Sequence, residues 1–152
     1  MVNAISACFK KYFTTSGRAS RSEFWWFFLV AGMANTAAEA AGMAIPAPGG
    51  ALTAGLVRIA FCIPLSTAWV RRLHDIGKSG WYYGASFALS GFCAVEIVNA
   101  SVLRSKTAVV LMCISLAVFL LYAVFLLVIS AFKGNPGENK YGPPPRSSGS
   151  GN

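Results

Sequence analysis

The residues best suited to chemistry lie close together in the segment from position 71 to 82, RRLHDIGKSGWY. His74 and Asp75 are adjacent, and a histidine beside a carboxylate can act as a general acid–base pair. Adjacent residues on a helix do not face each other, however, and no serine or cysteine nucleophile stands out beside these two. We therefore expect an ion-pair network rather than a catalytic centre. Binding of anionic lipid headgroups by the same basic residues is the alternative.

The expected network joins this segment to charged residues near the N-terminus. Its members are Arg18, Arg21, Glu23, Arg71, Arg72, His74 and Asp75. Asp75 is the only carboxylate of its segment, and many cations surround it in the sequence. We expect it to anchor the network.

A second set of charges lies within the long apolar stretches of the chain. A charge inside a membrane span is costly and needs a partner. Arg58 lies within such a stretch, and Glu39 and Glu96 lie near the far ends of two others. We expect Arg58 to pair with Glu39, with Glu96 or with both, and so to fix neighbouring helices. The alternatives are a proton- or ion-handling site, and an arginine that reaches the outer surface of the membrane.

The residue types that hold metals and cofactors are poorly represented. The four cysteines (Cys8, Cys62, Cys93 and Cys113) form no C-x-x-C pair, and His74 is the only histidine. The sequence has no phosphate-binding loop and neither a G-x-S-x-G nor an H-E-x-x-H motif. We expect no metal, no cofactor and no enzymatic activity.

The composition predicts an all-α, polytopic membrane protein. Of the 152 residues, 55% are hydrophobic and 12% are charged, whereas about a quarter of the residues of a soluble domain are charged. Because about 20 apolar residues cross the hydrocarbon core as a helix, four spans are predicted, at about 23–42, 52–73, 81–100 and 108–130. They form a single domain over residues 1–145, and residues 146–152 are expected to be a disordered tail. The first span is expected to be retained rather than cleaved as a signal peptide.

The basic residues predict the orientation of these spans. Thirteen lysines and arginines against five acidic residues give a formal net charge of +8. Most of these cations lie at the N-terminus, between the second and third spans, or in the tail. The positive-inside rule then places both termini in the cytoplasm, and the charge indicates a bilayer rather than nucleic acid as the partner.

The segment before the first span predicts a short amphipathic helix on the membrane surface. Its apolar residues recur at helical spacing, and two lysines occupy the opposite face. These apolar residues are Ile5, Cys8, Phe9, Tyr12 and Phe13.

Three motifs together resemble the bacterial domain of unknown function 805 family of inner-membrane proteins. They are SGRASRSEFWWF at 16–27, RRLHDIGKSGWY at 71–82 and GNPGENKYGPPP at 134–145. The resemblance covers nearly the whole chain and implies a small polytopic protein of the bacterial inner (plasma) membrane, without a catalytic assignment. All three motifs lie on the cytoplasmic side of the predicted topology. We therefore expect one composite structure, in which Asp75 bridges to Arg18 or Arg21 and residues 134–142 fold back over the loop.

Two functional hypotheses follow from the sequence. The first is a non-enzymatic interaction or assembly module, whose polar network contacts lipid headgroups or a protein partner. The second is a small oligomeric transporter or channel that uses Arg58 with Glu39 and Glu96. Gly80 and Gly84 form a G-x-x-x-G pair. We expect this pair to serve helix packing within the chain, with a homo-oligomer face as the alternative.

Overall fold

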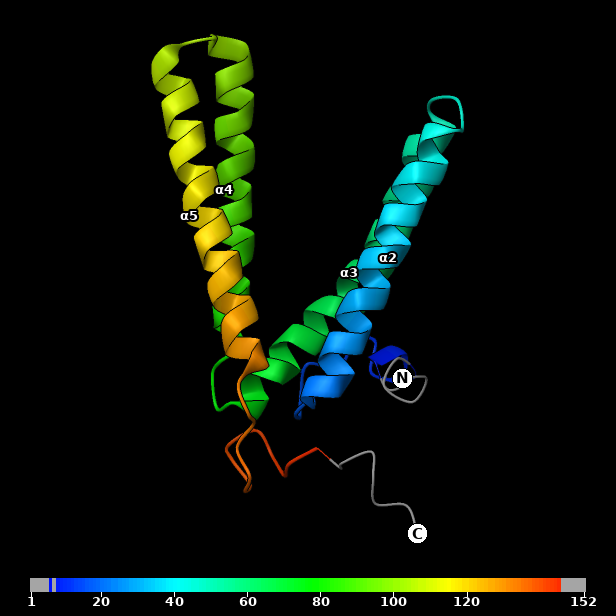
Figure 1. Cartoon of the computed structure of the whole chain (residues 1–152), viewed down its shortest axis with the longest axis vertical. Helices are drawn as coiled ribbons and strands as arrows, with labels where there is room; N and C mark the ends of the chain where they lie inside the picture. Colours follow the sequence, from blue (N-terminus) through cyan, green and yellow to red (C-terminus); the bar gives the residue numbers. More distant parts are fainter. Residues whose placement is uncertain (1–5, 7, 146–152) are drawn as a thin grey trace.

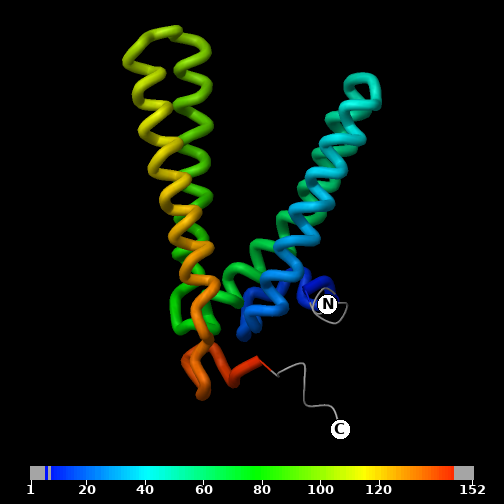
Figure 2. The backbone as a smooth tube through the Cα atoms, in the orientation of Figure 1, coloured from blue at the N-terminus to red at the C-terminus, as the bar shows by residue number. Residues whose placement is uncertain are grey.

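Two helical hairpins diverge from a shared base in the computed structural model, which describes residue 6 and residues 8–145 (Figure 1). Helices α2 (Arg21–Met43) and α3 (Gly49–Asp75) form one hairpin, and α4 (Trp81–Leu103) and α5 (Lys106–Ala131) form the other. Contacts between the hairpins involve chiefly α3 with α4 and α5. The backbone trace therefore has the shape of a V (Figure 2). All the named elements are helices, so the all-α prediction is confirmed.

Three of the helices, α3, α4 and α5, are long and apolar enough to cross a membrane. The first predicted span falls in α2, which does not belong to this set. Asn35, Thr36 and Glu39 lower the hydropathy of the second half of α2. The prediction of four spans is therefore not confirmed.

Specific residues begin α2 and end α3 at the base of the V. The Ser20 side chain accepts a hydrogen bond from the backbone N–H of Glu23 at 3.2 Å, which caps the N-terminus of α2. Gly77 has a left-handed backbone with φ of 75°, and the N–H of Lys78 bonds the carbonyl of Leu73 at 2.9 Å. This is the Schellman arrangement that commonly ends a helix. The two ends bring the charged residues of both segments to the same place.

A hydrophobic core joins the two hairpins at the base. On the α4 side, the ring of Tyr83 stacks on Trp69 at a centroid distance of 5.4 Å. A Cβ added at Gly80 would lie 2.8 Å from the side chain of Val70, so glycine permits the close approach of α4 to α3. The buried members of the core come from four segments of the chain: Cys8, Phe24, Phe27, Ala31, Ala68, Trp69, Leu73, Leu126 and Ile129.

The N-terminal segment is docked on the α2–α3 hairpin. Residues 8–10 are helical, and the Phe9 ring makes edge contacts with Phe27 and Phe61 at 5.4 and 5.9 Å. The described part of the predicted amphipathic helix is thus a single turn that packs against protein, and Ile5 lies outside the described residues.

This docking satisfies a backbone group that a proline leaves unpaired. Pro64 lies inside α3 and has no N–H to bond the carbonyl four residues earlier, which belongs to Ala60. The hydroxyl of Tyr12 donates to that carbonyl at 2.8 Å. In a membrane, a free carbonyl of this kind must find a donor within the protein. Tyr12 supplies it.

Replacing Tyr12 with phenylalanine is expected to lower the free energy of unfolding by about 1 kcal/mol, the typical net value of one hydrogen bond. In a Pro64→Ala background the new N–H can bond Ala60, so the same change should cost little. Thermal unfolding of the four proteins in detergent measures this coupling. Tyr82→Phe is the control, because its hydroxyl has no hydrogen bond among the described residues. If Tyr12→Phe lowers the free energy of unfolding equally in both backgrounds, Tyr12 does not compensate for the N–H that Pro64 lacks.

Candidate functional site

A buried polar cluster occupies the base of the V, beneath the hydrophobic core. We call it the basal cluster and define it as Arg18, Glu23, Arg71, Arg72, His74 and Asp75, together with the tail residues 134–142. Arg71 and Arg72 are fully buried, and Arg18, Asp75 and Glu23 are 4%, 3% and 9% exposed. Three buried guanidinium groups therefore share two carboxylates. The remaining donors need other acceptors, and among the described residues all but the buried Arg71 Nε have one.

Arg72 connects three parts of the chain through one guanidinium group. Its Nε donates to the carbonyl of Ser130 at 2.8 Å, and its other nitrogens donate to the carbonyls of Ala19 and Phe132. It also forms a salt bridge with Asp75. Arg72 thus ties the end of α3 to the segment before α2 and to the end of α5.

Arg18 connects the same carboxylate to the C-terminal tail. Its guanidinium pairs with Asp75 Oδ1 at 2.9 Å and donates to the carbonyls of Gly137 at 2.7 Å and Gly142 at 3.3 Å. The carbonyl of Asn135 is a further acceptor. Asp75 therefore lies between two arginines, one bound to the tail and the other to α5. The expected contact of Asp75 with Arg18 is present.

The tail folds back over the end of α3, as the three motifs predicted. The ring of Tyr141 stacks on His74 with centroids 3.8 Å apart and planes 7° from parallel. The Asn139 side chain donates to the His74 carbonyl at 3.0 Å, and the N–H of Asn135 donates to the Asp75 carbonyl at 2.9 Å. The Asp75 carbonyl thereby gains a backbone donor, and the His74 carbonyl, which already accepts from the N–H of Gly77 at 3.1 Å, gains a second donor.

Arg71 forms a separate pair with Glu23. The thiol of Cys8 lies 3.7 Å from Glu23 Oε1 and 3.8 Å from a nitrogen of Arg71. Burial, assisted by the neighbouring Glu23 carboxylate, raises the pKa of Cys8 to about 11. The thiol is therefore protonated at neutral pH and can donate to the carboxylate, so this cysteine is not placed as a nucleophile.

The adjacent His74 and Asp75 do not act on each other. His74 Nδ1 lies 3.3 Å from the carbonyl of Gly17, whereas Asp75 faces Arg18 and Arg72. The geometry does not form an acid–base pair from these two residues. No group of three or more histidine, cysteine, aspartate or glutamate side chains that could hold a metal occurs among the described residues.

Arg21 and Glu96 were both expected to form ion pairs, and neither does so among the described residues. Arg21 is exposed and forms no salt bridge within residues 8–145. Arg58 pairs with Glu39, but Glu96 makes no ion pair in the same part of the chain. Arg58 belongs to the α2–α3 hairpin and Glu96 to the other one, which diverges from it. Of the two partners predicted for Arg58, Glu39 is therefore in contact and Glu96 is not.

Sequence reasoning missed the acceptors that complete the basal cluster. The carbonyls of Ser130 and Phe132 bind Arg72, and backbone acceptors carry no signature in a sequence. It also missed the burial of Cys8. The apolar helical face to which Cys8 and Phe9 belong was the signal for this burial. We interpreted that face as one that contacts the membrane surface.

Comparisons with known proteins give one match. The family model described as "Protein of unknown function (DUF805)" matches residues 12–143. This stretch contains helices α2 to α5 and the charged members of the basal cluster. No curated protein and no solved structure matches the chain.

Proposed function

We propose a role for this chain, which belongs to the DUF805 family of proteins of unknown function, as a non-enzymatic, membrane-embedded interaction module. One observation carries the proposal. The two hairpins are tied together at the base of the V, while their outer apolar faces are left open. The buried guanidinium groups are bound to carbonyls and carboxylates of the chain itself, so they hold the hairpins in place.

The charge distribution supports a location in the bacterial inner membrane, with the base of the V on the cytoplasmic side. Helix α2 runs beside α3 (Figure 1), so a bilayer that α3 crosses also surrounds α2 and makes it the fourth span. Four spans put both termini on one side, which the positive-inside rule makes cytoplasmic. Exposed cations near the base would then meet anionic lipid headgroups. They are Lys10, Lys11, Arg21, Lys78 and Lys133.

Affinity capture of the whole protein from solubilised membranes tests the module. We expect a defined set of membrane proteins, or further copies of the chain, to be retained with the wild type and lost with Asp75→Asn. Glu138→Gln is the matched control, because Glu138 is an exposed acid outside the buried ion pairs. An identical set with wild type and Asp75→Asn would contradict the proposal, and so would an empty one.

A small oligomeric transporter or channel is the second candidate, and one groove favours it. Arg58 and Glu39 line a groove of about 370 Å³ together with the polar side chains of Asn35 and Thr36. In an oligomer this groove and Glu96 could line a pathway. Proteoliposomes distinguish the candidates, because a transporter should give ion or solute flux that Arg58→Ala abolishes, whereas a module should give none.

A further inference from the structure

Glu96 is a carboxylate in a membrane-spanning helix without an ionic partner. It lies in α4, between the exposed apolar residues Val95 and Ile97. It forms no salt bridge or hydrogen bond with any part of the chain that the structure describes. A carboxylate in a span is costly unless a cation or donor meets it. A partner from outside the chain would remove that cost.

The guanidinium group of Arg58 has N–H donors that could bind a further carboxylate. Its side chain remains 66% exposed although it pairs with Glu39. A guanidinium group carries five N–H donors, and one hydrogen bond from Arg58 to a carboxylate is observed. The group can therefore bind a second carboxylate without releasing Glu39.

Arg58 and Glu96 are separated from the base of the V by nearly the same length of helix. Arg58 lies 17 residues before Asp75, the last residue of α3, and Glu96 lies 15 residues after Trp81, the first of α4. At 1.5 Å per residue these separations are about 26 and about 23 Å along the helices. Helix α3 ends at the base and α4 begins there (Figure 2). Arg58 and Glu96 therefore lie at similar positions along their helices, about two-thirds of the way from the base to the tip.

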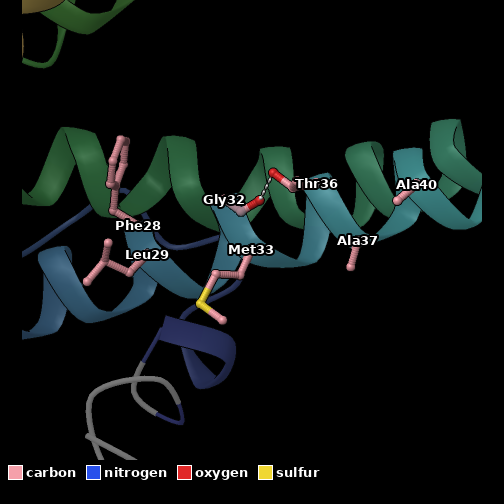
Figure 3. A pocket seen from close by; sticks show the side chains of 7 residues that line it. All are labelled: Phe28, Leu29, Gly32, Met33, Thr36, Ala37 and Ala40. Atoms are coloured by element: carbon pink, nitrogen blue, oxygen red, sulfur yellow. Dashed lines mark hydrogen bonds between the residues drawn. The ribbon is translucent and has the colours of Figure 1, made fainter.

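An open apolar groove runs along α2 (Figure 3). It has a volume of about 560 Å³ and is lined by Phe28, Leu29, Gly32, Met33, Thr36, Ala37 and Ala40. A Cβ added at Gly32 would meet nothing within 4 Å, so a helix can approach closely there. Thr36 also lines the groove that contains Arg58 and Glu39. A helix lying in the α2 groove would thus border the exposed guanidinium.

We propose that two copies of the chain associate about a two-fold axis along the membrane normal, with α4 of each copy in the α2 groove of the other. Glu96 then accepts a hydrogen-bonded ion pair from Arg58 of the partner subunit. The two-fold axis repeats this contact, because an isologous interface uses every contact twice. This inference rests on the proposed interaction module and names a second copy as its partner.

Inverting the charges of the contact tests this interface. In the variants that change Arg58, Glu39 is inverted as well, so that an ion pair between α2 and α3 is kept. Two copies with different affinity tags are co-expressed, extracted in mild detergent and captured through one tag, and the other tag is then measured. Glu96→Arg alone places like charges together. The double variant Glu39→Arg/Arg58→Glu does the same while keeping an ion pair within α2–α3. Each is expected to reduce co-capture at least about tenfold, which corresponds to about 1.4 kcal/mol.

The triple variant Glu39→Arg/Arg58→Glu/Glu96→Arg restores every opposite-charge contact and is expected to recover the wild-type co-capture. Glu96→Gln removes the charge without adding a cation to the membrane, and it should also reduce co-capture if the pair forms. Melting temperatures of all variants verify that each is folded. The dimer is overturned if wild-type copies fail to co-purify, if the single and double inversions and Glu96→Gln leave co-capture unchanged, or if a folded triple variant does not regain it. If the second copy is not co-captured but other membrane proteins are retained in the Asp75-dependent manner described above, the dimer is excluded and the interaction module stands.

Discussion

Replacing Arg72 with lysine is expected to lower the free energy of unfolding by about 3–5 kcal/mol, because at least two hydrogen bonds of a charged group would be lost and each contributes about 1.5–3 kcal/mol. Arg72 is fully buried, and its guanidinium group binds Ala19, Asp75 and the end of α5 at once. A lysine ammonium keeps the charge but concentrates its donors at one point. Most of these acceptors would therefore lose their donor. Thermal unfolding in detergent, followed by tryptophan fluorescence, measures the loss.

Arg21→Lys is the matched control for this substitution. Arg21 is the first residue of α2, at the base of the V, and its side chain is exposed. Substitutions at exposed positions usually change the free energy of unfolding by less than about 0.5 kcal/mol. Similar losses for both variants would show that exchanging a guanidinium for an ammonium group is costly at any site, and not that the buried contacts of Arg72 stabilise the base. An unchanged unfolding curve for Arg72→Lys would contradict its role directly.

Replacing Gly134 with alanine is expected to displace the folded-back tail. A Cβ at this position would lie 1.9 Å from Asp75 Oδ2, so the tail or Asp75 must move. The hydrogen bonds of Arg18 to the tail would then be lost, and bonds to a charged group contribute about 1.5–3 kcal/mol each. We expect a destabilisation of about 2–4 kcal/mol, together with faster amide hydrogen exchange over residues 134–142.

Gly137→Ala separates this contact from the general effect of adding a methyl group to the tail. A Cβ at Gly137 would meet nothing within 4 Å, although its carbonyl accepts from Arg18. We expect hydrogen exchange in this variant to stay close to that of the wild type. Equal protection in the Gly134 and Gly137 variants would show that the tail does not depend on close contact with Asp75.

The fold-back and much of the helical pattern were predictable because side chains encode them directly. Gly77 ends α3 with a left-handed backbone, and an uninterrupted apolar run forms α5. The three polar motifs lie on one side of the predicted topology, so their meeting followed from connectivity. The pair of Arg18 with Asp75 followed from the scarcity of carboxylates among many cations.

Other contacts were not predictable from the sequence. Some involve backbone carbonyls, which no side chain marks, and others depend on the angle at which the two hairpins diverge. A sequence shows that Pro64 frees the carbonyl of Ala60, but not that Tyr12 will reach it. The depths of Glu39 and Glu96 fit Arg58 equally well. Only the arrangement of the hairpins decides that Glu39 is the neighbour. The span predicted at about 23–42 is not confirmed for a related reason, because the polar residues of α2 leave it outside the set of helices apolar enough to cross a membrane.

The central claim is that the basal cluster holds the two hairpins at a defined angle. The most direct measurement is the distance distribution between spin labels at positions 47 and 105, near the two tips of the V, in lipid nanodiscs. Labels on non-natural amino acids leave the four native cysteines in place. Helices stay inserted in a bilayer because their backbone groups bond internally, so the distance reports how the hairpins are held. We predict one narrow distribution for the wild type and for Arg21→Lys, and a broad one for Arg72→Lys. A narrow, unchanged distribution in Arg72→Lys would contradict the claim.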